Sequence, residues 1–245
     1  MRFSLKLWLL LAPLTVLSAA CSVLEEAASP PTATPGVVAN VLVNGGFEGG
    51  EGPWTFREQA EWFGFEIARA PVRSGEGSLH LALRDDGGAA TVHIAGAVQE
   101  VNPREFPEFV SGYYRVEDWQ PHDVAFQYVQ FVVIVYGGGD RDDDFDLQIR
   151  FPLAGAAREP FLIANAKWVF LSRGPPPTGE WVYFGYPLRQ AFIDRWGKAP
   201  AVWDRIELFL EVRYDGKKAG DAGMSADVYF DDVYLGTQLG NPNRP

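Results

Sequence analysis

Apolar and polar residues alternate through most of the second half of the chain. In FDLQIRF (145–151), Phe, Leu, Ile and Phe occupy one side, while Asp146, Gln148 and Arg150 occupy the other. In RIELFLEVRY (205–214), Ile206, Leu208, Leu210, Val212 and Tyr214 share one parity. Successive side chains of a β-strand point to opposite faces, so a period of two predicts strands with one buried face.

Seven further segments have strand character, and turn-forming clusters such as RSGEG and RDDGG separate them. They span residues 78–83, 91–101, 109–116, 124–136, 168–172, 181–188 and 226–235. No βαβ repeat occurs, so the sequence predicts an all-β, antiparallel sandwich. One short helix is predicted at LRQAFIDRW (188–196), and residues 152–177 form a long loop insertion on one edge, with a short strand inside it.

The composition favours one large core between residues 38 and 237. Hydrophobic residues make up 47% of the sequence, and β-sandwiches of about this size often form a single domain. Only one cysteine is present, Cys21, so no internal disulfide can support the fold. Residues 238–245 (QLGNPNRP follows Thr237) are predicted to be a frayed tail.

The N-terminus has the pattern of a secretory signal. Arg2 and Lys6 precede an apolar stretch, and Ser18-Ala19-Ala20-Cys21 resembles a bacterial lipobox, with Leu17 one place further from the cysteine than usual. We expect a signal peptide at 1–20, lipidation of Cys21 and an extended Pro/Ala/Ser/Thr-rich tether at 21–37. An ordinary signal peptide with a chance cysteine, or with a buried thiol, is the alternative.

The charge of the chain is strongly acidic. The formal net charge is −11, and loss of the two basic residues of the signal leaves 19 Lys+Arg against 32 Asp+Glu. Such a surface repels nucleic acid and anionic lipid, so membrane attachment depends on the acyl chains. We therefore expect a secreted bacterial lipoprotein at the surface of the cell envelope, with no nucleic-acid partner.

Five motifs occur in an order that resembles the carbohydrate-binding modules of families 4 and 9, within the galactose-binding-like group. They are NVLVNGGFEGG with the following PW, RSGEGSLHL, AVQEV, GEWVYFGYPL and VYFDDVYLG, and together they extend over residues 38–236. The resemblance implies a jelly-roll sandwich whose first and last strands lie near each other. It also implies a non-catalytic protein that binds a glycan or a glycoconjugate.

The same resemblance implies a structural Ca²⁺ ion between the ends of the fold. Ca²⁺ takes six to eight oxygen ligands. The side chains of Glu48 and Asp231 are the expected carboxylate ligands, with carbonyl oxygens near Asn44, Ser74 and Glu76. The alternative is that Asn44-Gly45-Gly46 is only a tight turn, and that Asp231 is solvated or has an arginine partner.

The expected glycan surface is one face of the long strand VAFQYVQFVVIVY (124–136). Both faces of this strand are largely apolar, which predicts a central strand that is partly covered on each side. The candidate ligand-binding residues are Tyr128, Gln130, Gln148, Arg150 and, at the edge of the surface, Trp119. The alternative is that Tyr128 belongs to the core and Gln130 is an outward amide, and a covering 152–177 insertion would exclude a long-chain glycan.

No catalytic motif is present. His80, His93 and His122 are scattered, and the sequence contains no HExxH, GxSxG or phosphate-binding loop. Asp140, Asp142, Asp144 and Asp146 are interpreted as a charged hairpin tip, with a second metal site as the alternative. We therefore expect no enzyme. The competing hypotheses are a surface adhesion or assembly lipoprotein that binds a protein partner and, least favoured, a polysaccharide hydrolase.

Overall fold

The computed structural model describes residues 40–60, 62–85, 88, 92–120, 126–139 and 146–238. The predicted signal peptide, Cys21, the tether, nearly all of the tail and the acids 140–144 lie outside this part of the chain. The chain divides into two compact units, Met1–Gly36 and Val37–Pro245, and every described residue belongs to the second. Within the described residues, no helix has the length and apolar character needed to cross a membrane.

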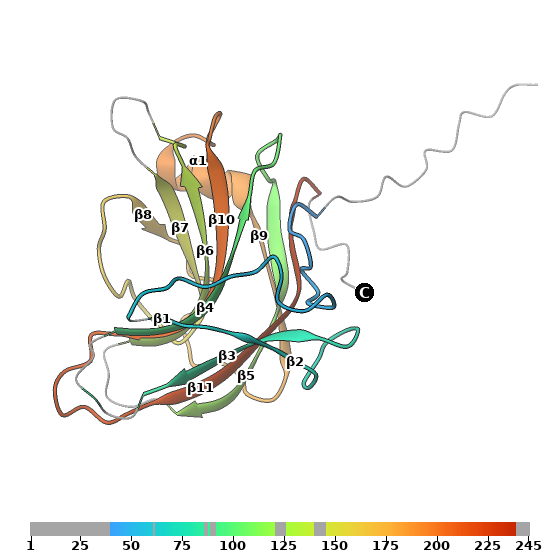
Figure 1. Ribbon diagram of the computed structural model, residues 1–245. Coiled ribbons are helices and arrows are strands. Elements are labelled where there is room, and N and C mark those ends of the chain that lie inside the picture. The colour runs from blue at the N-terminus through green and yellow to red at the C-terminus, as the bar shows by residue number, and fades with distance from the viewer. Residues whose placement is uncertain are drawn as a thin grey trace, which may run out of the picture. The chain divides into compact units, whose positions relative to one another are not determined.

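The described part of the second unit contains strands and one short helix (Figure 1). In chain order these are β1 (Trp62–Phe63), β2 (Glu66–Ala68), β3 (Ser78–Arg84), β4 (Val92–Val101), β5 (Phe109–Gln120), β6 (Phe126–Tyr136), β7 (Leu147–Ala154), β8 (Ala166–Trp168), β9 (Trp181–Pro187), α1 (Leu188–Trp196), β10 (Arg205–Asp215) and β11 (Ser225–Gly236).

The strands form two sheets that face each other (Figure 1). One has six strands in the order β1-β4-β10-β6-β7-β8, and the other has five in the order β2-β3-β11-β5-β9. Neighbouring strands are antiparallel except in the pairs β1–β4 and β7–β8. The all-β sandwich predicted from the alternation is therefore confirmed.

The core lies between the two sheets, and the predicted parity of the strands is correct. Ile206, Leu208, Leu210, Val212 and Tyr214 of β10 are all fully buried in it. The predicted helix also forms, at the predicted bounds. It ends at Gly197, whose left-handed conformation lets its N–H reach the carbonyl of Ile193.

One predicted strand is displaced. The sequence indicates a strand at 168–172, whereas β8 covers Ala166–Trp168 at the edge of the sheet. Leu171 still donates its N–H to the carbonyl of Pro152 on β7, at 2.9 Å. Because proline has no N–H to donate in return, the two-way ladder cannot continue past this point.

The two ends of the domain lie side by side. The N–H of Val41 donates to the carbonyl of Leu235, and the N–H of Val233 donates to the carbonyl of Gly45, both at 2.8 Å. The Asn40 side chain adds hydrogen bonds to Val233 and Leu235. A Cβ on Gly45 would lie 2.1 Å from the Val233 carbonyl oxygen, so only glycine allows this approach.

Candidate functional site

The outer face of the six-stranded sheet is covered at both ends and hollow between them. Alternate residues of β6 and β10 point into the core, and the residues between them, which are polar, aromatic and in part aliphatic, point outward. These outward residues include Tyr128, Gln130, Val132, Glu207, Phe209, Glu211 and Arg213.

The insertion covers one end of this outer face. Phe161, Trp168 and Phe170 pack with Tyr128 in a separate buried apolar cluster. Tyr128 is fully buried, and its hydroxyl donates to Asp215 Oδ2 at 2.6 Å. Its ring therefore supports the covering layer and has no free face for stacking.

The segment 55–63, of which every residue but Glu61 is described, covers the other end. Thr55 bridges to Val98 of β4, and Trp62 pairs with Ile94, so this segment follows the edge of the sheet. The Trp62 ring lies 6.0 Å from that of Phe209 and rests above Gly96, where a Cβ would come within 2.7 Å of the indole. The glycine therefore makes room for a tryptophan that lies on the sheet.

Arg57 ties the segment 55–63 down. Its guanidinium pairs with Glu207 of β10 and donates to the Tyr136 hydroxyl of β6 at 3.1 Å. It also lies 5.2 Å from the centre of the Phe209 ring. Three contacts from one side chain join the covering segment to two central strands.

A pocket of about 300 Å³ remains between the two covers, near the lower end of the usual size of small-molecule sites. Its walls combine aromatic, aliphatic and charged groups. It is lined by Arg57, Gln59, Trp62, Ile94, Val132, Ile134, Arg150, Phe209, Glu211 and Arg213.

The charged floor of the pocket is held by β10. Arg213 Nη2 pairs with Asp215 at 2.8 Å, and its Nη1 lies 3.5 Å from Glu211 Oε2. Gln130 Nε2 donates to the same Glu211 oxygen at 2.5 Å. Buried groups connected in this way keep one orientation, which is what a recognition site requires.

Arg150 reaches the pocket from β7. Its Cζ lies 5.0 Å from the centre of the Phe161 ring and 5.6 Å from that of Trp168. Burial lowers the pKa of Arg150, an effect that attraction to Glu211 opposes and repulsion from Arg213 reinforces. The interior therefore disfavours the charge of this guanidinium relative to water.

The structure brings only some of the predicted glycan residues together. Arg150 lines the pocket, and Gln130 lies beneath it through Glu211. Gln148 is buried away from it and donates to Asn165 Oδ1 at 3.1 Å. Trp119 belongs to β5 of the other sheet and packs against the main core, so it is not at the edge of this surface.

Sequence reasoning missed several pocket residues. Phe209, Glu211 and Arg213 alternate with the core residues of β10. The alternation that identified the core therefore also placed these three residues on the outer face. Arg57 and Trp62 had no such signal, because the segment between residues 55 and 61 has no regular period. Only the tertiary fold shows that this segment lies over the sheet.

The predicted calcium residues also meet at one place, the loop 73–77. The Glu48 carboxylate accepts the N–H of Glu76 at 2.8 Å and that of Gly77 at 3.2 Å. Asp231 Oδ2 accepts the N–H groups of Arg73 and Ser74 at 2.9 and 3.2 Å. The two carboxylates thus fasten the ends of the domain to a single loop.

The predicted ligand residues do not form a prepared calcium site. The loop turns N–H groups, not carbonyl oxygens, toward both carboxylates, and the Asn44 carbonyl accepts the Trp54 Nε1–H. Asp232 pairs with Arg73, and the described residues contain no group of three or more His, Cys, Asp or Glu arranged to hold a metal. A cation would have to displace these donors, and calcium binding stays a prediction.

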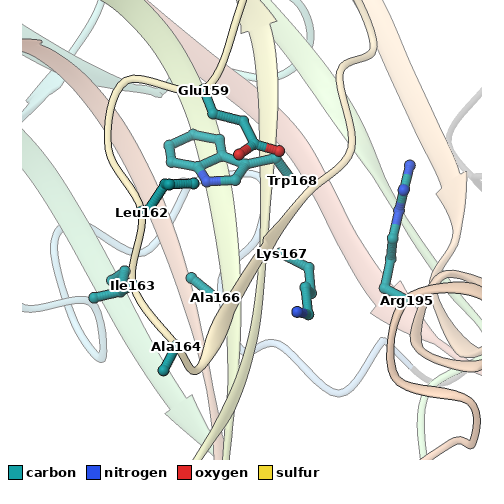
Figure 2. A pocket seen from close by; sticks show the side chains of 8 residues that line it. All are labelled: Glu159, Leu162, Ile163, Ala164, Ala166, Lys167, Trp168 and Arg195. Atoms are coloured by element: carbon teal, nitrogen blue, oxygen red, sulfur yellow. The ribbon is translucent and has the colours of Figure 1, made fainter.

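A second pocket, of about 340 Å³, opens at the edge strand β8 (Figure 2). Lys167 and Arg195 lie on one side of it, and Leu162 and Ile163 of the insertion lie on the other. Leu162 is 86% exposed and Ile163 is 42% exposed. This edge therefore presents apolar side chains next to two cations.

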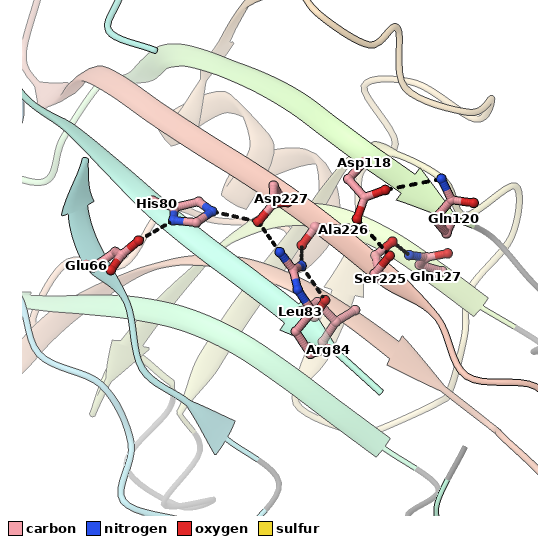
Figure 3. Close-up of polar contacts among 10 residues, drawn as sticks. All are labelled: Glu66, His80, Leu83, Arg84, Asp118, Gln120, Gln127, Ser225, Ala226 and Asp227. Carbon is pink, nitrogen blue, oxygen red and sulfur yellow. Dashed lines mark hydrogen bonds and ion pairs between the residues drawn. The ribbon is translucent and has the colours of Figure 1, made fainter. Parts of the chain in front are cut away.

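The outer face of the five-stranded sheet carries a network of ion pairs (Figure 3). The His80 ring lies between Glu66 and Asp227, with both nitrogen–oxygen distances 2.8 Å. Arg84 pairs with the same Asp227 at 2.6 Å, and His80 stacks on Tyr229. These contacts join β2, β3 and β11 and are consistent with a structural role for His80.

No protein-family model matches the chain, and no curated protein matches it. Among solved structures, it is similar to TmCBM61 in complex with β-1,4-galactotriose, with 16% identity and a TM-score of 0.43 over 82% of this chain and 99% of that one. The CBM22-1 xylan-binding domain of Paenibacillus barcinonensis Xyn10C shows 15% identity and a TM-score of 0.38, over 82% and 97% of the two chains.

A third similarity is to a tailspike protein of bacteriophage CBA120, with 10% identity and a TM-score of 0.40 over 80% of this chain and 21% of that one. Similarities this low decide neither the family nor the function. Families 4 and 9 therefore stay a prediction from the sequence motifs.

Proposed function

We propose that this protein binds carbohydrate in the pocket between the segment 55–63 and the 152–177 insertion. The observation that carries the proposal is the lining itself. An indole ring lies next to charge-bearing groups that are held by further hydrogen bonds. Aromatic rings stack on the apolar faces of sugars, while fixed donors and acceptors bind hydroxyl groups, and this pocket offers both kinds of contact.

The roles of the residues follow from their positions. Trp62 supplies the aromatic surface, and Gln59 and Arg57 border it. Glu211 is held in the floor by the hydrogen bond from Gln130. The covers at both ends limit the ligand to a few sugar units or to a chain end. A long polysaccharide lying along the sheet would collide with the insertion.

The test is calorimetric titration with a panel of oligosaccharides, including galactan, xylan and glucan fragments. We expect Trp62→Ala to weaken binding at least tenfold, since stacking on one aromatic ring accounts for a large part of such affinity. The matched control is Phe56→Ala, which removes an exposed ring from the same segment but outside the pocket lining. Equal effects of the two substitutions would reject this site.

A protein partner is the second candidate function, and the exposed Leu162 and Ile163 at the β8 edge favour it. Two adjacent exposed apolar side chains next to cations suit an interface with an acidic surface. In cells, Leu162→Asp should abolish cross-linking to one defined envelope protein. Val202→Asp, at another exposed apolar position, should leave that cross-link intact.

The proposal includes the expected location and the absence of catalysis. A lipid on Cys21 would hold the domain at the bacterial surface, and labelling with a clickable fatty acid, lost in Cys21→Ser, tests this. The side-chain carboxylates of Glu207 and Glu211 are engaged by Arg57 and Gln130, which supports binding over hydrolysis. Release of reducing ends from any glycan of the panel would revive the hydrolase hypothesis.

A further inference from the structure

Arg150 differs from the two other arginines of the pocket. Arg57 pairs with Glu207, and Arg213 pairs with Asp215. The Nε and Nη1 atoms of Arg150 are buried and have no hydrogen-bond partner among the described residues. The guanidinium is therefore left with unused donors at the wall of the pocket.

An unpaired cation in this position is costly. A buried charge loses its hydration, and a buried donor without an acceptor loses a hydrogen bond that water would have made. Folded proteins keep few such groups, and those that remain require an explanation such as a ligand. The rings of Phe161 and Trp168 attract the cation but accept none of its in-plane N–H bonds.

Glu211 does not supply the missing partner. It is the acid whose attraction opposes the effect of burial on Arg150. However, its Oε2 atom already accepts Gln130 Nε2 and lies 3.5 Å from Arg213 Nη1. Both of these contacts use Oε2 on the β10 side of the floor, and no hydrogen bond joins Glu211 to Nε or Nη1 of Arg150, which approaches from β7.

The lining is locally basic on an acidic protein. Three arginines and one glutamate border the pocket, whereas the whole chain has a formal net charge of −11. Arg57 and Arg213 have acidic partners just outside the lining, in Glu207 and Asp215. Together with Glu211, these acids equal the three arginines in number, so Arg150 lacks hydrogen-bond acceptors for its Nε and Nη1 and not a counter-charge.

We propose that the pocket selects acidic sugars and that Arg150 pairs with the carboxylate of a uronic acid unit. This inference rests on the proposed carbohydrate function and adds the class of ligand. A guanidinium matches a planar carboxylate in geometry, and charge-assisted hydrogen bonds are about twice as strong as neutral ones. Trp62 would stack on the ring that carries the carboxylate or on its neighbour.

The experiment compares uronic acid oligosaccharides with their methyl esters, which keep the sugar and remove the charge. Galacturonate, glucuronate and mannuronate oligomers are titrated into the wild-type domain at pH 7, together with neutral and sulfated oligosaccharides. We expect at least one acid to bind ten or more times tighter than its methyl ester. Arg150→Gln should remove that preference, so that the acid and its methyl ester bind with affinities within twofold of each other.

The matched control is Arg158→Gln, which removes an exposed arginine from the 152–177 insertion, outside the lining. It should keep the preference for the acid. Thermal unfolding supplies a readout that does not depend on ligand. Arg150→Gln should unfold at the same temperature as wild type or higher, because it removes an unpaired buried cation, whereas a structural arginine would lower that temperature when lost.

The outcomes separate the two proposals. Equal affinity for acid and ester, or an equal loss of both in Arg150→Gln, would overturn the acidic ligand and leave carbohydrate binding intact. Preference for sulfated over carboxylated sugars would overturn the assignment to a uronic acid. Binding of no oligosaccharide would overturn the proposed function, and this inference with it.

Discussion

At the scale of single residues, Asp231 and Asp232 of β11 make different contacts where the two ends of the domain meet. Asp231 is fully buried and accepts backbone N–H groups of the 73–77 loop, while Asp232 pairs with Arg73. Burial raises the pKa of Asp231 to about 6, and repulsion from Asp232 adds to this, against the lowering by the Arg73 and Ser74 N–H bonds. The arginine alternative foreseen for Asp231 thus applies to its neighbour.

The raised pKa predicts a pH dependence. The usual value is 3.8, so between about pH 4 and 6 the folded protein holds a proton that the unfolded chain has lost. The stabilisation from Asp231 is complete below about pH 4 and is lost as the pH rises through 6, by roughly 2–3 kcal/mol. Urea unfolding in EDTA gives the free energy of unfolding at each pH. Between about pH 4 and 6 this free energy should fall with pH more steeply in wild type than in Asp231→Asn, and parallel plots of free energy against pH would contradict the prediction.

Gly45 gives a second prediction at this scale. A Cβ there would lie 2.1 Å from the Val233 carbonyl oxygen, so Gly45→Ala should push the opening segment off β11. We expect a loss of about 2–3 kcal/mol in the free energy of unfolding, as for other steric insertions into packed sites. Gly174→Ala, at a position with no atom within 4 Å, should change it by less than about 0.5 kcal/mol.

At the scale of elements, the alternation of side chains along β6 and β10 builds both the core and the floor of the pocket. The inward residues of β6 and β10 form the core, and their outward residues form the floor of the pocket. The edges differ, because β1 and β8 are short parallel additions that carry the covering segments. The pocket thus combines a rigid floor with walls supplied by loops, an arrangement common in binding proteins.

The contact between β1 and β4 can be tested at Gly96. A Cβ at this position would lie 2.7 Å from the Trp62 ring, so Gly96→Ala should lift the indole from the sheet. We expect about a fivefold loss of oligosaccharide affinity in calorimetry. The same substitution in a Trp62→Ala background should have a much smaller effect on binding, and an unchanged loss there would mean that Gly96 acts by another route.

At the scale of the whole molecule, the fold is closed by contacts between residues far apart in sequence. The opening segment hydrogen-bonds β11, and Glu48 and Asp231 both hold the 73–77 loop. Without an internal disulfide, these contacts restrain the ends of the domain. Whether an ion adds to them is a question of stability in solution.

The calcium prediction implies that EDTA lowers the melting temperature of the wild type and that added Ca²⁺ restores it. Glu48→Gln, which removes a proposed ligand charge, should melt at the same temperature with and without chelator. Differential scanning calorimetry measures both. An unchanged wild-type melting temperature in EDTA would contradict the calcium prediction. The hydrogen bonds to the 73–77 loop would then be the link between the ends of the domain.

The sequence by itself determined the all-β class, the helix and the inward faces of β6, β7 and β10, because these follow from local periodicity, and burial of one strand face is enough to produce it. Tertiary structure alone decided that the segment 55–63 lies over the sheet and that the insertion buries Tyr128. It also decided that Arg150 reaches the pocket with no hydrogen-bond partner for its Nε and Nη1 among the described residues. Such placements depend on contacts between residues distant in the chain, and no local pattern records which irregular segment will cover which face.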